Sequence, residues 1–120
     1  GRLFEGTPAQ MWASLGVLAR LPAATRVYCG HEYTLANLRF ASAVEPGNPD
    51  VIARMAHERA KRERGEPTLP STIALERTTN PFLRAGVAAV RAAAARQAGQ
   101  PLHDDVATFA ALRAWKNEFR

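Results

Sequence analysis

The stretch VYCGHEYT, residues 27–34, contains the histidine that is best placed to do chemistry. His31 follows a short β-prone segment, and Gly30 before it lets the backbone turn and project the imidazole. Imidazole is a common ligand of zinc and iron. The alternative is a polar turn histidine that hydrogen-bonds to its neighbours, and the local sequence alone favours that interpretation.

The rest of the chain offers no second histidine at ligand spacing from His31. We expect His57, in a charged helix, and His103, in a loop, to be solvated. Cys29 lies two residues before His31, but no third group is indicated that would orient a cysteine–histidine pair for nucleophilic attack. We therefore expect Cys29 to be a small buried core residue. This chain cannot complete a metal site by itself.

Arg113 and Lys116 stand three residues apart in a predicted C-terminal helix, so they share a face of it. Two cations on one face suit a carboxylate, which arginine can bind with two parallel hydrogen bonds. Trp115 and Phe119 occupy a neighbouring face and can anchor the helix. The alternative is a solvated basic surface at a helix C-terminus, where the helix dipole stabilises cations. From the residues alone, this alternative is the favoured interpretation.

The basic run RAKRER, residues 59–64, is the candidate for nucleic-acid binding. It includes Glu63, follows Glu58 and has no interleaved aromatic residues, and no recognised DNA- or RNA-binding signature accompanies it. A solvated helix face is the favoured interpretation.

The composition fits one modest globular domain. The chain has 120 residues, of which 47% are hydrophobic, and a formal net charge of +5, which suits an anionic partner. No stretch is long and apolar enough to span a membrane. The single cysteine is compatible with a reducing compartment, so we expect a cytoplasmic protein. Because Leu3 and Phe4 follow the first residue at once, we expect a fragment of a longer protein that begins inside a fold at Gly1.

The hydrophobic periodicity predicts a mainly helical chain with one short strand that has no partner. Capping residues, prolines and glycines set the expected boundaries. Met11, Leu15 and Leu18 share one face of the first helix. Leu38, Ala41 and Val44 are expected to point inward from the second helix, and Val51, Ile52 and Met55 can face a core from the third. The expected elements are helices at 7–20, about 34–44, 49 to about 64 with Asn48 as its cap, 86–98, and from 104 or 105 to about 119, the strand 25–29, and an extended, ordered connector 66–84 whose Leu69, Ile73, Leu75, Phe82 and Leu83 need burial.

Four segments, in the right order and spacing, resemble the C-terminal part of the hydroxyacylglutathione hydrolases (glyoxalase II). They are GRLFEGT at the start, VYCGHEYTLANLRFASAVEPGN, GEPTLPSTIALERTTNPFLR and LRAWKNEF near the end. The resemblance implies a helical substrate-binding domain over residues 32–120. It also implies that residues 1–31 are the tail of an αββα catalytic domain of the metallo-β-lactamase type.

The resemblance further implies hydrolysis of S-(2-hydroxyacyl)glutathione thioesters, such as S-lactoylglutathione, in methylglyoxal detoxification. The family uses two metal ions, zinc and often iron or manganese, to activate the attacking water. His31 would be a ligand to one metal, and Tyr33, Arg113, Lys116 and Arg2 would contact the glutathione moiety. We expect a monomer in the full-length enzyme and neither a nucleic acid nor a membrane as partner.

The chain also departs from the family pattern. Phe4 stands where some members have a tyrosine, and Arg2 where some have a lysine. The THxHxDH motif, a further histidine and the bridging aspartate are not in this chain, so we expect no intact binuclear centre and little activity from it alone. The remaining alternatives are a basic helical nucleic-acid-binding module and a paralogous metal-dependent thioesterase.

Overall fold

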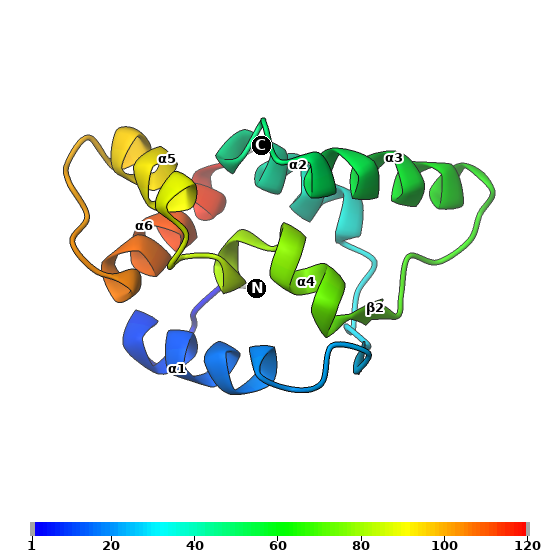
Figure 1. Ribbon diagram of the computed structural model, residues 1–120, viewed down its shortest axis with the longest axis horizontal. Helices are drawn as coiled ribbons and strands as arrows, with labels where there is room; N and C mark the ends of the chain where they lie inside the picture. The colour runs from blue at the N-terminus through cyan, green and yellow to red at the C-terminus, as the bar shows by residue number, and fades with distance from the viewer. Residues whose placement is uncertain (1, 120) are drawn as a thin grey trace. The chain divides into compact units, whose positions relative to one another are not determined.

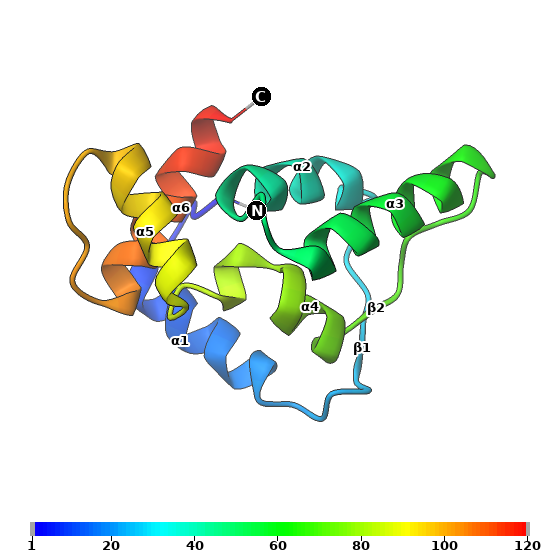
Figure 2. The ribbon, with the colours of Figure 1, turned by 45° about the horizontal axis from the view of Figure 1, so that its top comes forward.

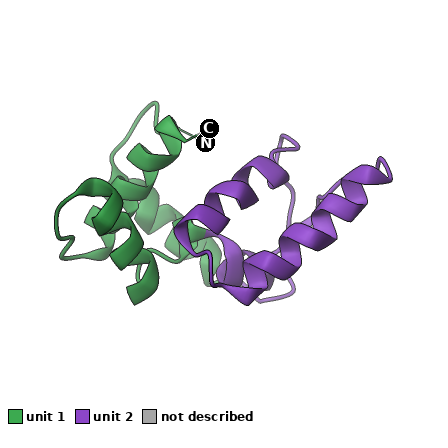
Figure 3. Ribbon diagram, turned by 90° about the horizontal axis from the view of Figure 1, so that it is seen from above, with its two compact units in different colours: residues 1–20, 81–120 green, residues 21–80 purple. Residues whose placement is uncertain are grey.

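The computed structural model describes residues 2–119, which form two compact units. The first unit combines the two ends of the described chain, residues 2–20 and 81–119, and the second contains residues 21–80 (Figure 3). The N-terminal and C-terminal segments thus share one core, although they are far apart in sequence.

Helices dominate both units, as the sequence predicts. No helix among residues 2–119 is long and apolar enough to cross a membrane. In chain order the elements are α1 Pro8–Ala19, β1 Arg26–Val27, α2 Thr34–Val44, α3 Pro49–Glu63, β2 Ser71–Thr72, α4 Ile73–Thr79, the 3-10 helix η1 Pro81–Leu83, α5 Ala88–Ala98 and α6 Asp105–Glu118 (Figure 1).

The core of the first unit forms where α5, α6 and α1 meet. Helices α5 and α6 lie side by side (Figure 2), and α1 packs against α6 and η1. The cap glycine between α5 and its following loop, Gly99, has the left-handed conformation expected of a helix C-terminus, with φ of 71°. The fully buried apolar side chains here include Val90, Ala94, Phe109 and Leu112.

Helix α1 begins with the predicted capping box but is buried less than expected. The Thr7 side chain accepts a hydrogen bond from the Gln10 backbone N–H, and the Gln10 side chain accepts one from Thr7 N–H. Met11 and Leu15 are only partly buried. Leu18, which shares their face of the helix, is 51% exposed, so this apolar face is buried only in part.

In the second unit, α2 packs against α3. Leu38, Ala41 and Val44 are buried, as the spacing along α2 predicts. Val51 of α3 is also buried, but Ile52 is 55% exposed because it lies one residue, or about 100° of helix rotation, from that face.

The prediction of one strand without a partner is wrong. β1 pairs antiparallel with β2, with Arg26 opposite Thr72 and Val27 opposite Ser71. This pairing satisfies the backbone groups that a single strand would leave without partners. The hydrogen bond from Ile73 N–H to the Thr25 carbonyl, 2.9 Å, continues the contact beyond the strands.

The connector 66–84 is less extended than predicted, because it contains α4 and η1. Thr72 caps α4 by accepting a hydrogen bond from Leu75 N–H at 3.2 Å. The helix has only seven residues and ends just before Pro81, too short a stretch to reveal a helical period. Ile73 is buried, as predicted, and Leu69, Leu75, Phe82 and Leu83 are partly buried.

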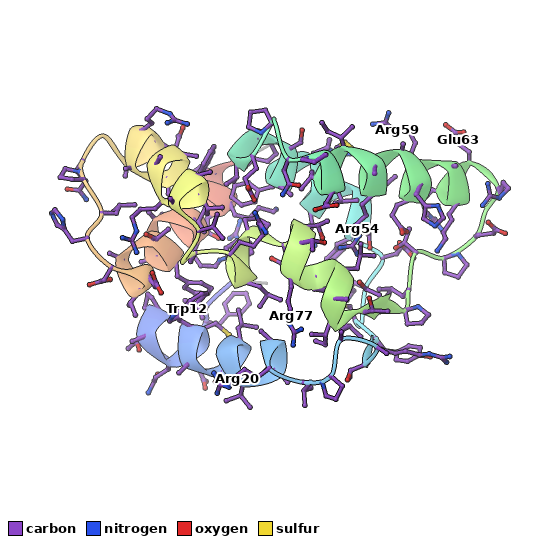
Figure 4. The ribbon with its side chains drawn as sticks, in the orientation of Figure 1. Trp12, Arg20, Arg54, Arg59, Glu63 and Arg77 are labelled. Carbon is purple, nitrogen blue, oxygen red and sulfur yellow. The ribbon has the colours of Figure 1, made fainter. Side chains whose placement is uncertain are left out.

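A buried arginine joins α3, α4 and β2. Arg54 is 8% exposed and lies on the side of α3 that faces α4, whereas Arg59 and Glu63 lie on its opposite side (Figure 4). Its Nη1 donates to Glu76 Oε2 at 2.5 Å and to the Thr79 hydroxyl at 2.8 Å, and its Nη2 donates to the Ser71 hydroxyl at 3.2 Å. These contacts compensate for moving the guanidinium out of water.

The charged second half of α3 is not uniformly solvated. Arg59, Arg62 and Arg64 are exposed, in agreement with the solvated-face interpretation. Glu58, in contrast, is only 2% exposed, with its carboxylate 4.0 Å from Lys61 Nζ. A run of charges in the sequence does not reveal which member faces inward.

Replacement of Arg54 by methionine should destabilise the second unit strongly. It leaves the Glu76 carboxylate partly buried without its cation, and breaking such a pair costs about 3 kcal/mol. The matched control is Arg64→Met, which removes an exposed partner of Glu66 and should cost less than about 1 kcal/mol. Urea unfolding measures both, and equal losses of stability would contradict the assigned role of Arg54.

Candidate functional site

Helix α6 carries the two cations that the sequence singled out, and its start is firmly fixed. The Asp104 side chain accepts a hydrogen bond from Ala107 N–H at 2.7 Å, and Asp105 lies in the first turn, where an acid suits the helix dipole. Phe109 and Leu112 face the core of the first unit. Arg113, four residues after Phe109, continues this buried face.

Arg113 is buried rather than solvated, contrary to the surface interpretation. Its side chain is 9% exposed, and its guanidinium carbon lies 4.7 Å from the centre of the Phe82 ring. Nη2 donates a hydrogen bond to Asn117 Oδ1 at 2.8 Å. Nε is buried and has no hydrogen-bond partner. This Nε–H therefore lacks an acceptor among residues 2–119, as do the buried Nε atoms of Arg54 and Arg91.

The charge of Arg2 adds to the positive potential at Arg113. Burial lowers the pKa of the Arg113 guanidinium, and the positive charge of Arg2 lowers it further. An arginine stays protonated despite such shifts. Lys116, partly buried, follows one turn later on α6. The structure thus brings Arg2 and Arg113 within electrostatic range, in support of a site for an anion.

His31 and Tyr33 form a second group, located after β1 in the second unit. Their rings stack with centres 4.9 Å apart and an angle of 5° between the planes. Both side chains are exposed, Tyr33 at 60%. The imidazole is accessible to a ligand, as its position after the strand predicts.

Glu32, between these two aromatic residues, ties the segment to the connector. One carboxylate oxygen accepts a 3.1 Å hydrogen bond from Thr68 N–H, and the other accepts one from the Thr68 hydroxyl. The hydroxyls of Thr68 and Thr34 also lie 2.6 Å apart. The hydrogen bond from the Thr68 hydroxyl is the main reason why the pKa of the Glu32 carboxyl is lowered. Thr68 is buried, so this contact holds the 31–33 segment in place.

The predicted site residues fall into both units. His31 and Tyr33 belong to residues 21–80, and Arg2, Arg113 and Lys116 belong to the other unit. Cys29 is exposed, so its assignment to the core is wrong, because β1 ends at Val27 before reaching it.

No group of three or more histidine, cysteine, aspartate or glutamate side chains within residues 2–119 could hold a metal ion. The described residues alone therefore do not fit a metal site. The imidazoles of His57 and His103 are exposed, as predicted.

Four residues with clear roles in these groups escaped the sequence analysis: Phe82, Asn117, Glu32 and Thr68. Asn117 carried a detectable signal, since it stands four residues after Arg113 and therefore on the same helix face. The other contacts join residues distant in sequence, and only the fold reveals them.

Comparison with known proteins gives consistent matches over the whole chain. The family model described as "Hydroxyacylglutathione hydrolase C-terminus" matches residues 32–119. A protein of Alkalilimnicola ehrlichii named hydroxyacylglutathione hydrolase is 66% identical over 98% of the chain and 46% of its own length. Proteins of the same name from Cupriavidus metallidurans and Ectopseudomonas mendocina are 58% and 60% identical, over 45% and 46% of their lengths. The chain thus spans about half the length of the curated relatives it matches.

Replacement of Glu32 by alanine should loosen the 31–33 segment from the connector. The Thr68 amide then loses its acceptor, and we expect its hydrogen exchange to accelerate about tenfold, in line with one lost hydrogen bond. Glu66→Ala, which removes an exposed acid of the same connector, is the control and should leave Thr68 exchange unchanged. Unaltered protection of Thr68 in the Glu32 variant would show that the contact does not hold the segment.

Proposed function

Because the chain belongs to the family of hydroxyacylglutathione hydrolase C-termini, we propose that the protein hydrolyses S-(2-hydroxyacyl)glutathione thioesters. The products are glutathione and a 2-hydroxy acid, with the lactoyl thioester formed from methylglyoxal as the expected substrate. The role of this chain in that reaction is recognition of the glutathione moiety. The buried Arg113 guanidinium, whose partners among residues 2–119 are a neutral amide and a ring face and not a carboxylate, is the observation that carries the proposal.

A carboxylate ligand accounts for the state of Arg113 better than solvent does. A buried donor without an acceptor is costly, more so when it carries charge. Nε and the adjacent Nη present two parallel N–H groups, which match the two oxygens of a carboxylate. Glutathione carries two carboxylates. We therefore assign one of them to Arg113.

Lys116 and Arg2 are the other cations assigned to the glutathione moiety. Lys116 follows Arg113 by one helical turn, and the charge of Arg2 acts on the Arg113 guanidinium. Tyr33, in the second unit, is a proposed contact on the basis of the family resemblance, supported by the exposure of its ring. A cytoplasmic location and a monomeric full-length enzyme also remain predictions.

In the proposed reaction, water adds to the thioester carbonyl and the C–S bond breaks. The oxygen of water stays with the acyl group as the new carboxylic acid, and the glutathione sulfur leaves and takes up a proton. This chain holds the glutathione side, so that the acyl group is presented in one orientation. Such positioning lowers the entropic cost of the reaction.

His31 is proposed as one ligand of a metal centre in the full-length protein. A single exposed imidazole does not make a metal site. The other ligands would come from the part of the relatives' length that this chain does not span. Its place just after β1 and the Glu32–Thr68 contact beside it support a fixed orientation.

The experiment that tests glutathione recognition replaces Arg113 by methionine in the full-length protein. Methionine keeps much of the apolar volume and removes the charge, so we expect KM for S-lactoylglutathione to rise about 10-fold to 100-fold, the effect of losing a charge-assisted hydrogen-bonded pair. Arg96→Met removes the same charge from an exposed position on α5 and should leave KM within about twofold. An unchanged KM in the Arg113 variant would refute the clamp.

The metal assignment of His31 is tested by elemental analysis of the full-length protein. His31→Ala should lower the metal content per chain, because the centre loses a ligand, and kcat should fall with it. His57→Ala, which removes an exposed imidazole from α3, should leave the metal content intact. If both variants retain the metal content of the unaltered protein, His31 is not a ligand.

A further inference from the structure

We propose that Phe82 and Asn117 are positioning residues that set the orientation of the Arg113 guanidinium toward a ligand carboxylate. This inference rests on the proposed function and names the side chains that make recognition geometrically selective. All the residues involved belong to the first unit.

Phe82 fixes the plane of the guanidinium. The guanidinium carbon lies 4.7 Å from the ring centre, which places the cation over the negative face of the π-system. The Phe82 ring itself packs edge-on against Phe109, with ring centres 5.7 Å apart and an angle of 70° between the planes. Phe109 in turn contacts Trp12 of α1 at 5.9 Å. Three aromatic side chains thus form a continuous support from α1 to the charged group.

Asn117 fixes the remaining rotation. Its Oδ1 accepts from Nη2 at 2.8 Å, so the guanidinium cannot turn within its plane without losing this hydrogen bond. With the guanidinium held at these two contacts, Nε and Nη1 are left without an acceptor among residues 2–119, and Nε is buried. The pair of contacts therefore restricts how the remaining donors can meet a ligand.

The chemistry of the supporting residues favours a ligand over a purely structural role. A phenyl face and a neutral amide orient a cation without cancelling its charge. Among residues 2–119 no carboxylate pairs with Arg113, whereas buried Arg54 is neutralised by Glu76 at 2.5 Å. A structural cation is normally paired, since an unpaired buried charge is unfavourable. The Arg113 group is thus held ready for an external anion.

The test measures binding of two ligands to the full-length protein by calorimetry: glutathione, and glutathione diethyl ester, whose two carboxylates are masked. Phe82→Leu and Asn117→Leu should each weaken glutathione binding about 3-fold to 10-fold, the effect of losing one cation–π contact or one hydrogen bond to a charged group. Binding of the diester should change less than about twofold, because no charge-assisted contact is left to lose. Phe82→Tyr keeps the ring face and should bind glutathione like the unaltered protein.

Two matched variants separate positioning from general damage. Val51→Ala truncates a buried side chain of the second unit, and Glu118→Gln alters an exposed neighbour of Asn117 on α6. Neither should change glutathione affinity by more than about twofold. In turnover assays, the Phe82→Leu and Asn117→Leu variants should show raised KM with kcat within about twofold, as expected when ground-state and transition-state binding are lost equally.

Equal losses for glutathione and its diester, or unchanged affinity in both variants, would overturn the inference while leaving the proposed function standing. If the unaltered protein fails to bind glutathione, both the proposed function and the inference are wrong. Selective loss of carboxylate-dependent binding, restored by tyrosine at position 82, supports the assigned roles.

Discussion

An arginine that is nine-tenths buried without a carboxylate partner is the constraint on which the candidate site depends. The guanidinium of Arg113 cannot lose its charge at neutral pH, so the protein must orient it by contacts or leave it unfavourably desolvated. A phenyl face and one amide oxygen supply those contacts. Phe109 and Trp12 support the Phe82 ring, and the Asp104 cap fixes the start of α6. Both features help to hold the Arg113 guanidinium.

Comparison of the two buried arginines shows how one residue type takes two roles in one chain. Arg54 bonds to an acid and two hydroxyls, so most of its donors are used within the second unit and it joins three elements. Arg113 has one neutral acceptor and a ring face. The first arrangement stabilises a fold, and we propose that the second keeps a cation for a ligand. Burial alone does not distinguish these roles, whereas the charge of the partners does.

The sequence predicts long helices well, because their caps and periods are local. Thr7, Asn48, Asp104 and Gly99 mark helix ends where the structure has them. Elements that depend on distant pairing were missed. The backbone groups of the two-residue strands β1 and β2 find hydrogen-bond partners only after the connector folds back. The seven-residue α4 is too short to show a helical period.

The same distinction applies to the candidate site. The residue types of His31, Arg113 and Lys116 pointed to their chemistry, and the resemblance added Arg2 and Tyr33. Burial of Arg113 was not predictable, since a cation near a helix C-terminus is usually solvated. The supporting contacts of Phe82 and Thr68 cross 31 and 36 residues of sequence, so no local pattern encodes them. Exposure of Cys29 follows from the early end of β1, a boundary that sequence patterns set poorly.

We propose that the guanidinium of Arg113 receives a carboxylate of glutathione. The most direct measurement is the Nε–H resonance of Arg113 in nitrogen-15 NMR spectra of the full-length protein, assigned by its loss in Arg113→Met and followed while glutathione is added. The account predicts a saturable shift of this resonance and slower exchange of its proton with water, neither of which glutathione diethyl ester should produce. A resonance that stays unchanged while glutathione binds would contradict the account, because the carboxylate would then lie elsewhere.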